Sequence, residues 1–234
     1  MSVPYRSKPS LENAFARVDR AKEHLARLES EIDKALRGGV TIGSGLSGLF
    51  KVTVYPLPKI IPILIGETVF NLRSALDSLI FQLAYLDSGE VQRGTKFPIE
   101  DNANAWQTHI LGTGTRKMGR WKLWLPLLTP AHLAAIERLQ PFTGCDWTRT
   151  LRVLSNPDRH CELVVVEPHH QRSLAADAVM QDPAGPPQSA ELIRADARQS
   201  VVVVFDGGPP VMRTLERLQT ETAATLNNFN RDFL

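Results

Sequence analysis

Two long stretches of this chain repeat apolar residues at alternating intervals of three and four positions. The first follows Ser10, which is suited to cap a helix, and ends before Gly38 and Gly39. This spacing places the apolar residues on one face of a helix, so we predict a long N-terminal helix over residues 10–37 and a central helix over 64–86. The first stripe consists of Leu11, Ala14, Val18, Ala21, Leu25, Leu28, Ile32 and Ala35, and the second of Ile65, Val69, Leu72, Leu76, Leu79, Leu83 and Leu86.

The rest of the chain alternates shorter helical and extended patterns. Thr129 followed by Pro130 is a typical helix start, and a further helix is expected over 147–162. The segment 163–234 contains valine-rich strand candidates and a last amphipathic helix. We predict one α+β domain over residues 1–234, with a helical bundle body and a small antiparallel β-sheet appended to it.

The stripe of the N-terminal helix has the heptad spacing of a coiled coil. Such a stripe packs on the body of its own chain or pairs with a second copy. A homodimer through residues 11–37 is therefore one of two interpretations that the sequence leaves open.

Composition excludes several classes of protein. The chain has 234 residues, a net charge of +2 and two cysteines, which excludes a disulfide scaffold and gives no overall basic character. Neither a signal-peptide pattern nor a membrane-spanning apolar run is present, which predicts a soluble cytoplasmic protein with no membrane partner. The glycines of 43–48 match GxGxxG but follow a helix rather than a strand, so no cofactor is predicted.

Polar residues crowd into the segment 151–163, between apolar positions that favour burial. Buried polar groups are costly unless they are paired, so this cluster indicates either an internal network or a site. Arg73 and Asp77 of the central helix are four residues apart and can pair beside it. The full candidate catalytic set is His160, Arg159, Arg152, Asn156, Asp158, Asp77 and Arg73.

At four places the chain resembles an uncharacterised bacterial family with LRxxLD and NxDKH-type signatures. The matching stretches begin at Asn71, Phe97, Leu139 and Asn156, with Arg159 in place of the lysine. The arginine and histidine on a helix are also distantly similar to HEPN domains, many of which are metal-independent RNases. Seven residues separate Arg152 from His160, one more than the HEPN motif has.

The HEPN resemblance implies a testable RNase mechanism. His160 would act as acid and base on the RNA 2′-hydroxyl, and Arg159 or Arg152 would hold the phosphate. Asn156 and Asp158 would orient these groups.

The alternative is that the polar residues tie helices together, and that the protein is a binding or assembly module. The sequence leaves open whether the chain is an enzyme. It predicts no metal site, because Cys145, Cys161 and the histidines lack paired ligand spacing.

A basic stretch with tryptophans gives a second candidate surface. Alternating cations and aromatic rings can bind a phosphate backbone and stack bases, so RNA is a candidate partner there. The stretch contains Arg116, Lys117, Arg120, Trp121, Lys122 and Trp124.

Overall fold

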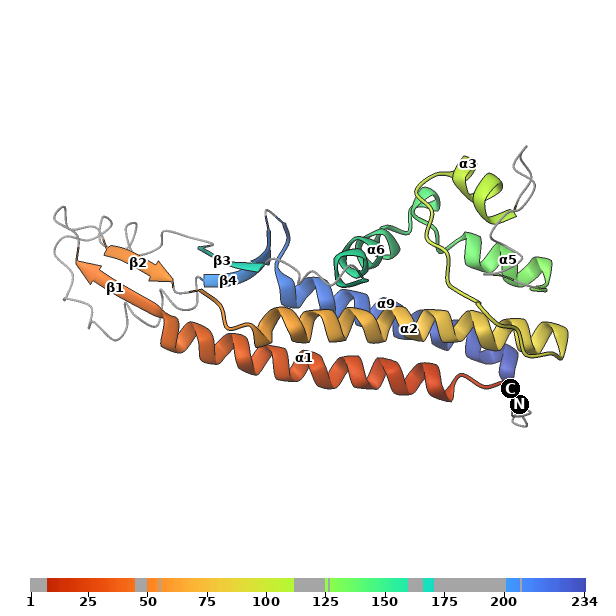
Figure 1. Cartoon of the computed structure of the whole chain (residues 1–234), viewed down its shortest axis with the longest axis horizontal. Coiled ribbons are helices and arrows are strands. Elements are labelled where there is room, and N and C mark those ends of the chain that lie inside the picture. Colours follow the sequence, from red (N-terminus) through yellow and green to blue (C-terminus); the bar gives the residue numbers. More distant parts are fainter. Residues whose placement is uncertain are drawn as a thin grey trace, which may run out of the picture.

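The computed structural model describes residues 8–44, 50–54, 56–111, 125, 127–159, 166–170, 201–206 and 208–234. Three long helices lie alongside one another (Figure 1): α1 (Glu12–Gly39), α2 (Ile60–Ser88) and α9 (Val211–Asn230). A fourth helix, α6 (Asp146–Arg159), packs against α2 and α9. The predicted helical body is confirmed.

The apolar stripe of α1 is buried inside the chain. Every member from Leu11 to Ile32 belongs to the hydrophobic core, and Ala35 packs against that core at its edge. Helix α1 contacts α2 along its length and α9 as well. A dimer through this stripe is therefore not supported, because packing on α2 and α9 leaves no apolar seam for a second copy.

Helix α2 is the centre of the fold and is longer than its pattern predicts. It begins at Ile60 rather than 64, with Pro62 inside its first turn. A proline is tolerated there because the first N–H groups of a helix have no intrahelical partner. The helix ends at Gly89, whose φ of 72° is a left-handed conformation that favours glycine, and whose N–H donates to the Tyr85 carbonyl.

The strands form two separate pairs instead of one sheet. β1 (Val40–Ser44) pairs antiparallel with β2 (Phe50–Val54) beyond the ends of α1 and α2 (Figure 1). β3 (Val166–His170) pairs antiparallel with β4 (Val201–Phe205), before α9. The predicted single small sheet is not supported, because no strand of one pair bonds to a strand of the other within the described residues.

Shorter elements cover one side of the helical body. α3 (Ala103–Ala105) leads into a π-helical turn, Trp106–Leu111, and a 3-10 turn, Pro141–Thr143, lies between α5 (Pro130–Glu137) and α6. The side chain of Thr129 accepts the His132 N–H, as expected for the cap of α5. Helix α6 runs through Pro157, so its backbone does not restart at Asn156. The chain ends in a 3-10 turn, Arg231–Phe233.

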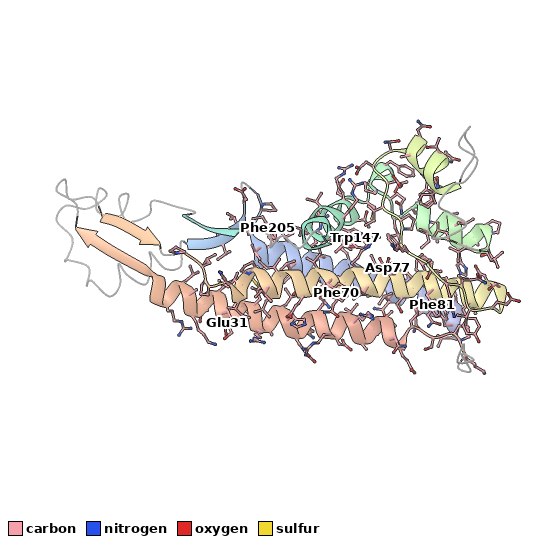
Figure 2. The ribbon with its side chains drawn as sticks, viewed as in Figure 1. Glu31, Phe70, Asp77, Phe81, Trp147 and Phe205 are labelled. Carbon is pink, nitrogen blue, oxygen red and sulfur yellow. The ribbon has the colours of Figure 1, made fainter. Side chains whose placement is uncertain are left out.

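The core follows α2. Its buried residues continue into α1, α6 and α9 as one cluster, to which Phe97 and Trp106 also belong. Figure 2 shows Phe70, Asp77 and Phe81 in succession along α2, with Trp147 above them on α6. Among the helices described, none has the length and apolar character needed to cross a membrane.

Candidate functional site

Arg73 and Asp77 of α2 together hold both backbone groups of Phe97. The Phe97 N–H donates to Asp77 Oδ1 at 2.8 Å, and Arg73 Nη2 donates to the Phe97 carbonyl. The two side chains face each other, with 3.7 Å between Arg73 Nη2 and Asp77 Oδ1. The Arg73 guanidinium also lies 5.9 Å from the centre of the Phe97 ring. The ion pair that the sequence predicts is present, and it anchors a neighbouring segment.

Gln140 holds the next part of that segment. Its Nε2 donates to the Pro98 carbonyl at 3.1 Å and to the Ile136 carbonyl at 3.0 Å, while its Oε1 accepts the Glu100 N–H at 2.9 Å. The side chain is fully buried. A buried glutamine with donors and an acceptor in use is a structural connector between the end of α5 and residues 98–100.

Two arginines of α6 hold the end of the segment. Arg152 Nη2 donates to Asp101 Oδ2, and Arg152 Nη1 donates to the Ile99 carbonyl at 3.4 Å. Arg149 Nε also donates to Asp101, at 3.2 Å. The hydrogen bond from Arg152 is the main cause that lowers the pKa of the Asp101 carboxyl below its ordinary value, because it stabilises the charged form.

These contacts explain how residues 97–101, which we call the clamped segment, are held in place without regular secondary structure. Phe97, Pro98 and Ile99 are buried, and within the described residues no backbone group of a helix or strand bonds to them. Side chains of Arg73, Asp77, Gln140 and Arg152 provide these partners instead. The motif positions LRxxLD, FPI and LQPF therefore meet in one network.

The side chains of the remaining predicted catalytic residues lie outside the described part of the structure. Asn156, Asp158 and Arg159 belong to the backbone of α6, and His160 lies outside the described residues. Arg73, Asp77 and Arg152 do converge, but each binds the clamped segment. The predicted nucleic-acid surface, from Arg116 to Trp124, also lies outside the described residues.

The described residues show neither a metal site nor a reactive thiol. Within the described residues, no three histidine, cysteine, aspartate or glutamate side chains are grouped to hold a metal ion. Burial raises the pKa of the Cys145 thiol, which disfavours the nucleophilic thiolate.

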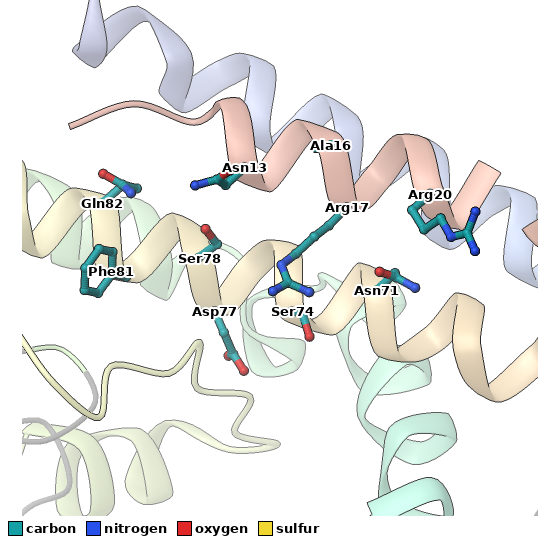
Figure 3. A pocket seen from close by; sticks show the side chains of 10 residues that line it. All are labelled: Asn13, Ala16, Arg17, Arg20, Asn71, Ser74, Asp77, Ser78, Phe81 and Gln82. Atoms are coloured by element: carbon teal, nitrogen blue, oxygen red, sulfur yellow. The ribbon is translucent and has the colours of Figure 1, made fainter. Parts of the chain in front are cut away.

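Sequence reasoning missed an open groove between α1 and α2. The groove has a volume of about 780 Å³, and both helices contribute polar side chains to it (Figure 3). It was missed because its residues are scattered along two helices and become neighbours only when the helices pack. Its lining consists of Asn13, Ala16, Arg17, Arg20, Asn71, Ser74, Asp77, Ser78, Phe81 and Gln82.

A second hollow follows the same two helices. It has a volume of about 380 Å³ and shares Arg20 and Asn71 with the groove. Ile63 and Phe70 of α2 line it and are exposed. Because two residues line both the groove and this hollow, the two lie next to each other along α1 and α2.

Sequence reasoning also missed a histidine that contacts carboxylates at the start of α5. His132 Nδ1 lies 2.8 Å from Asp87 Oδ2, and its Nε2 lies 3.4 Å from Asp232 Oδ2. Asp87 also accepts the Thr129 N–H at 2.7 Å. Because both ring nitrogens face carboxylates, this cluster joins the ends of α2, α5 and the chain instead of presenting a free base.

No protein family, curated protein or solved structure gave a match to this chain in the comparisons made. The resemblance to the bacterial family and to HEPN domains therefore stays a prediction.

Proposed function

We propose that this chain is a non-catalytic binding module, in which the polar residues of α2 and α6 hold the fold and the groove between α1 and α2 receives the ligand. The observation that carries the proposal is the use of Arg73, Asp77, Gln140 and Arg152 in the network around the clamped segment. Groups that hold buried backbone in place are not available to bind a reacting phosphate.

The groove supports the binding part of the proposal. Its volume of about 780 Å³ lies in the range of small-molecule sites, and it is open to solvent between two rigid helices. A groove built on helices keeps its polar groups in fixed positions, which suits recognition.

The structural part is tested by comparing two aspartates that pair with an arginine four residues away. Asp77→Ala removes the acceptor of the Phe97 N–H and should lower the free energy of unfolding by about 2–3 kcal/mol. Asp33→Ala removes a pair with Arg37 that is exposed on α1, and should leave the free energy of unfolding almost unchanged because solvent screens the pair. Urea denaturation followed by circular dichroism gives both values. Equal, small losses would show that the network does not support the fold.

The non-catalytic part is tested against the RNase alternative. Purified protein is incubated with labelled RNA in EDTA, beside a His160→Ala variant. We expect no cleavage above background from either protein. Cleavage by the wild type that the His160→Ala variant lacks would overturn the proposal and support the HEPN-like mechanism.

A further inference from the structure

The groove between α1 and α2 contains hydrogen-bonding groups that the fold does not use. Asn13 and Arg17 line it from α1, and Ser74 and Ser78 line it from α2. Across the described residues, the contacts found include no hydrogen bond or ion pair for any of these four side chains. This differs from the clamped segment, where the polar side chains are used by the backbone.

The four groups face one another because of helical spacing. Asn13 and Arg17 are four residues apart, as are Ser74 and Ser78, so each pair occupies one face of its helix. Figure 3 shows Arg17 reaching from α1 toward α2 in the neighbourhood of Ser74. A ligand in the groove would therefore meet donors from two sides.

Among the described charged residues that line the groove, Arg20 and Asp77 each have an ionic partner and Arg17 has none. Arg20 pairs with Glu23 at 2.6 Å, and in the adjoining hollow His24 Nδ1 lies 3.2 Å from Glu67 Oε2. Asp77 lines the groove, but its carboxylate is bound to the Phe97 N–H and faces Arg73, and in Figure 3 it points away from α1. The guanidinium of Arg17 therefore gives the groove a local positive charge.

We infer that this groove binds the phosphoryl group of a small phosphorylated molecule, with Arg17 as the main contact and Asn13, Ser74 and Ser78 as further donors. The inference rests on the proposed binding function and specifies its ligand. A guanidinium binds phosphate through two parallel hydrogen bonds. Tetrahedral phosphoryl oxygens spread in three dimensions and can meet donors on both helices, whereas the oxygens of a carboxylate lie in one plane.

The size of the groove favours a small molecule over a nucleic-acid strand. A volume of about 780 Å³ exceeds a phosphate ion and leaves space for an organic part beside Ala16 and Phe81. A strand presents a phosphate at every nucleotide and calls for a row of cations. The groove offers one uncompensated arginine among the described residues that line it.

The test is a binding titration of the full chain by isothermal calorimetry at constant ionic strength. The probes are inorganic phosphate, phenyl phosphate as a phosphomonoester with an apolar part, benzoate as a carboxylate, and a single-stranded RNA oligonucleotide. We expect phenyl phosphate to bind more tightly than inorganic phosphate, and both to bind more tightly than benzoate.

Variants assign the binding to the groove. Arg17→Ala should weaken phenyl phosphate binding by at least about tenfold, because a charge-assisted contact is lost. The double variant Ser74→Ala, Ser78→Ala should weaken it by about threefold or more. Arg27→Ala removes another exposed arginine of α1 outside the groove and should change the affinity less than about twofold. Because Arg17 is exposed, its variant should melt at the wild-type temperature.

The possible results distinguish an error in the inferred ligand from an error in the proposed function. Absence of phosphate and phenyl phosphate binding at about 10 mM, or equal affinity in Arg17→Ala and wild type, overturns the inference. Tight RNA binding that Arg17→Ala weakens also overturns it, because the groove would then receive a nucleic-acid strand instead of a small molecule. In each case the proposed binding module stands if the network variants lose stability and no RNA is cleaved, whereas cleavage dependent on His160 overturns the proposed function itself.

Discussion

Replacing Gln140 by leucine tests whether a single buried side chain holds the clamped segment. Leucine is similar in size and apolar, so it fills the same space without offering a hydrogen bond. The change leaves the Pro98 carbonyl without the Gln140 donor and the N–H of Glu100 without its acceptor. The Ile136 carbonyl loses one donor but still accepts the Leu139 N–H at 3.1 Å.

The magnitude follows from the burial of these three groups. The Pro98 contact is buried and should cost about 1–2 kcal/mol when its donor is removed. The Ile136 contact should cost less than about 1 kcal/mol, because the Leu139 N–H still donates to that carbonyl. The Glu100 contact is partly buried and should cost about 1 kcal/mol. Allowing for the favourable burial of leucine, we expect a net loss of about 2 kcal/mol in the free energy of unfolding. For a chain of 234 residues this corresponds to a melting temperature lower by roughly 4–8 °C.

Two further variants make the measurement specific. Gln219→Leu changes a half-buried glutamine of α9 and should shift the melting temperature by less than about 2 °C. Gln140→Glu keeps an acceptor for Glu100 but places a carboxylate against two carbonyl oxygens. Its stability deficit should therefore shrink as the pH falls and the carboxyl gains a proton.

Thermal and urea unfolding, followed by circular dichroism, give the stabilities. Hydrogen exchange at the backbone amide of Glu100 reports the clamped segment directly and should become faster in Gln140→Leu. A Gln140→Leu protein that melts with the wild type and keeps its Glu100 amide protected would refute the role of this side chain.

Further predictions concern the pH dependence, the helix ends and the core. The pKa of Asp101 is lowered in the folded protein, so its pairing with Arg152 contributes stability above about pH 4, and this contribution falls as the pH drops through the lowered pKa. Asp101→Asn should therefore reduce the free energy of unfolding by less than about 1 kcal/mol at pH 7 and by a smaller amount at acidic pH in urea titrations. A cost that stays the same or grows as the pH falls below about 4 would contradict this. Gly89→Ala should lower the free energy of unfolding by about 1 kcal/mol, because the φ of 72° is unfavourable for alanine. Gly38→Ala lies inside α1, with no atom near the new Cβ, and should raise the free energy of unfolding by about 0.5 kcal/mol. Changes of the same sign in the two variants would show that backbone conformation is not the cause. Leu76 is fully buried, so Leu76→Ala should lower the free energy of unfolding, measured by chemical denaturation, by about 3 kcal/mol. A loss below about 1 kcal/mol would show that Leu76 is not part of the core.

The sequence by itself determined the helices and the side of each that is buried. The stripes from Leu11 to Ile32 and from Ile65 to Leu83 are buried in the structure, because apolar residues at helical spacing can leave water only on one face. The cap at Thr129 and the pairing of Arg73 with Asp77 were also predictable, since both depend on residues close in sequence. Local physics sufficed for these features.

Only the tertiary structure decided what the polar residues do. The partners of Arg73 and Asp77 at Phe97 lie 20 to 24 residues away, and the partners of Gln140 at residues 98 and 100 lie 40 to 42 away. The periodicity of the sequence does not predict contacts between residues so far apart. They form because buried irregular backbone needs hydrogen-bond donors and acceptors, and the helices that pack over it supply them. The groove depends on packing in the same way: Arg17 and Ser74 belong to different helices, and they face one another because α1 packs along α2.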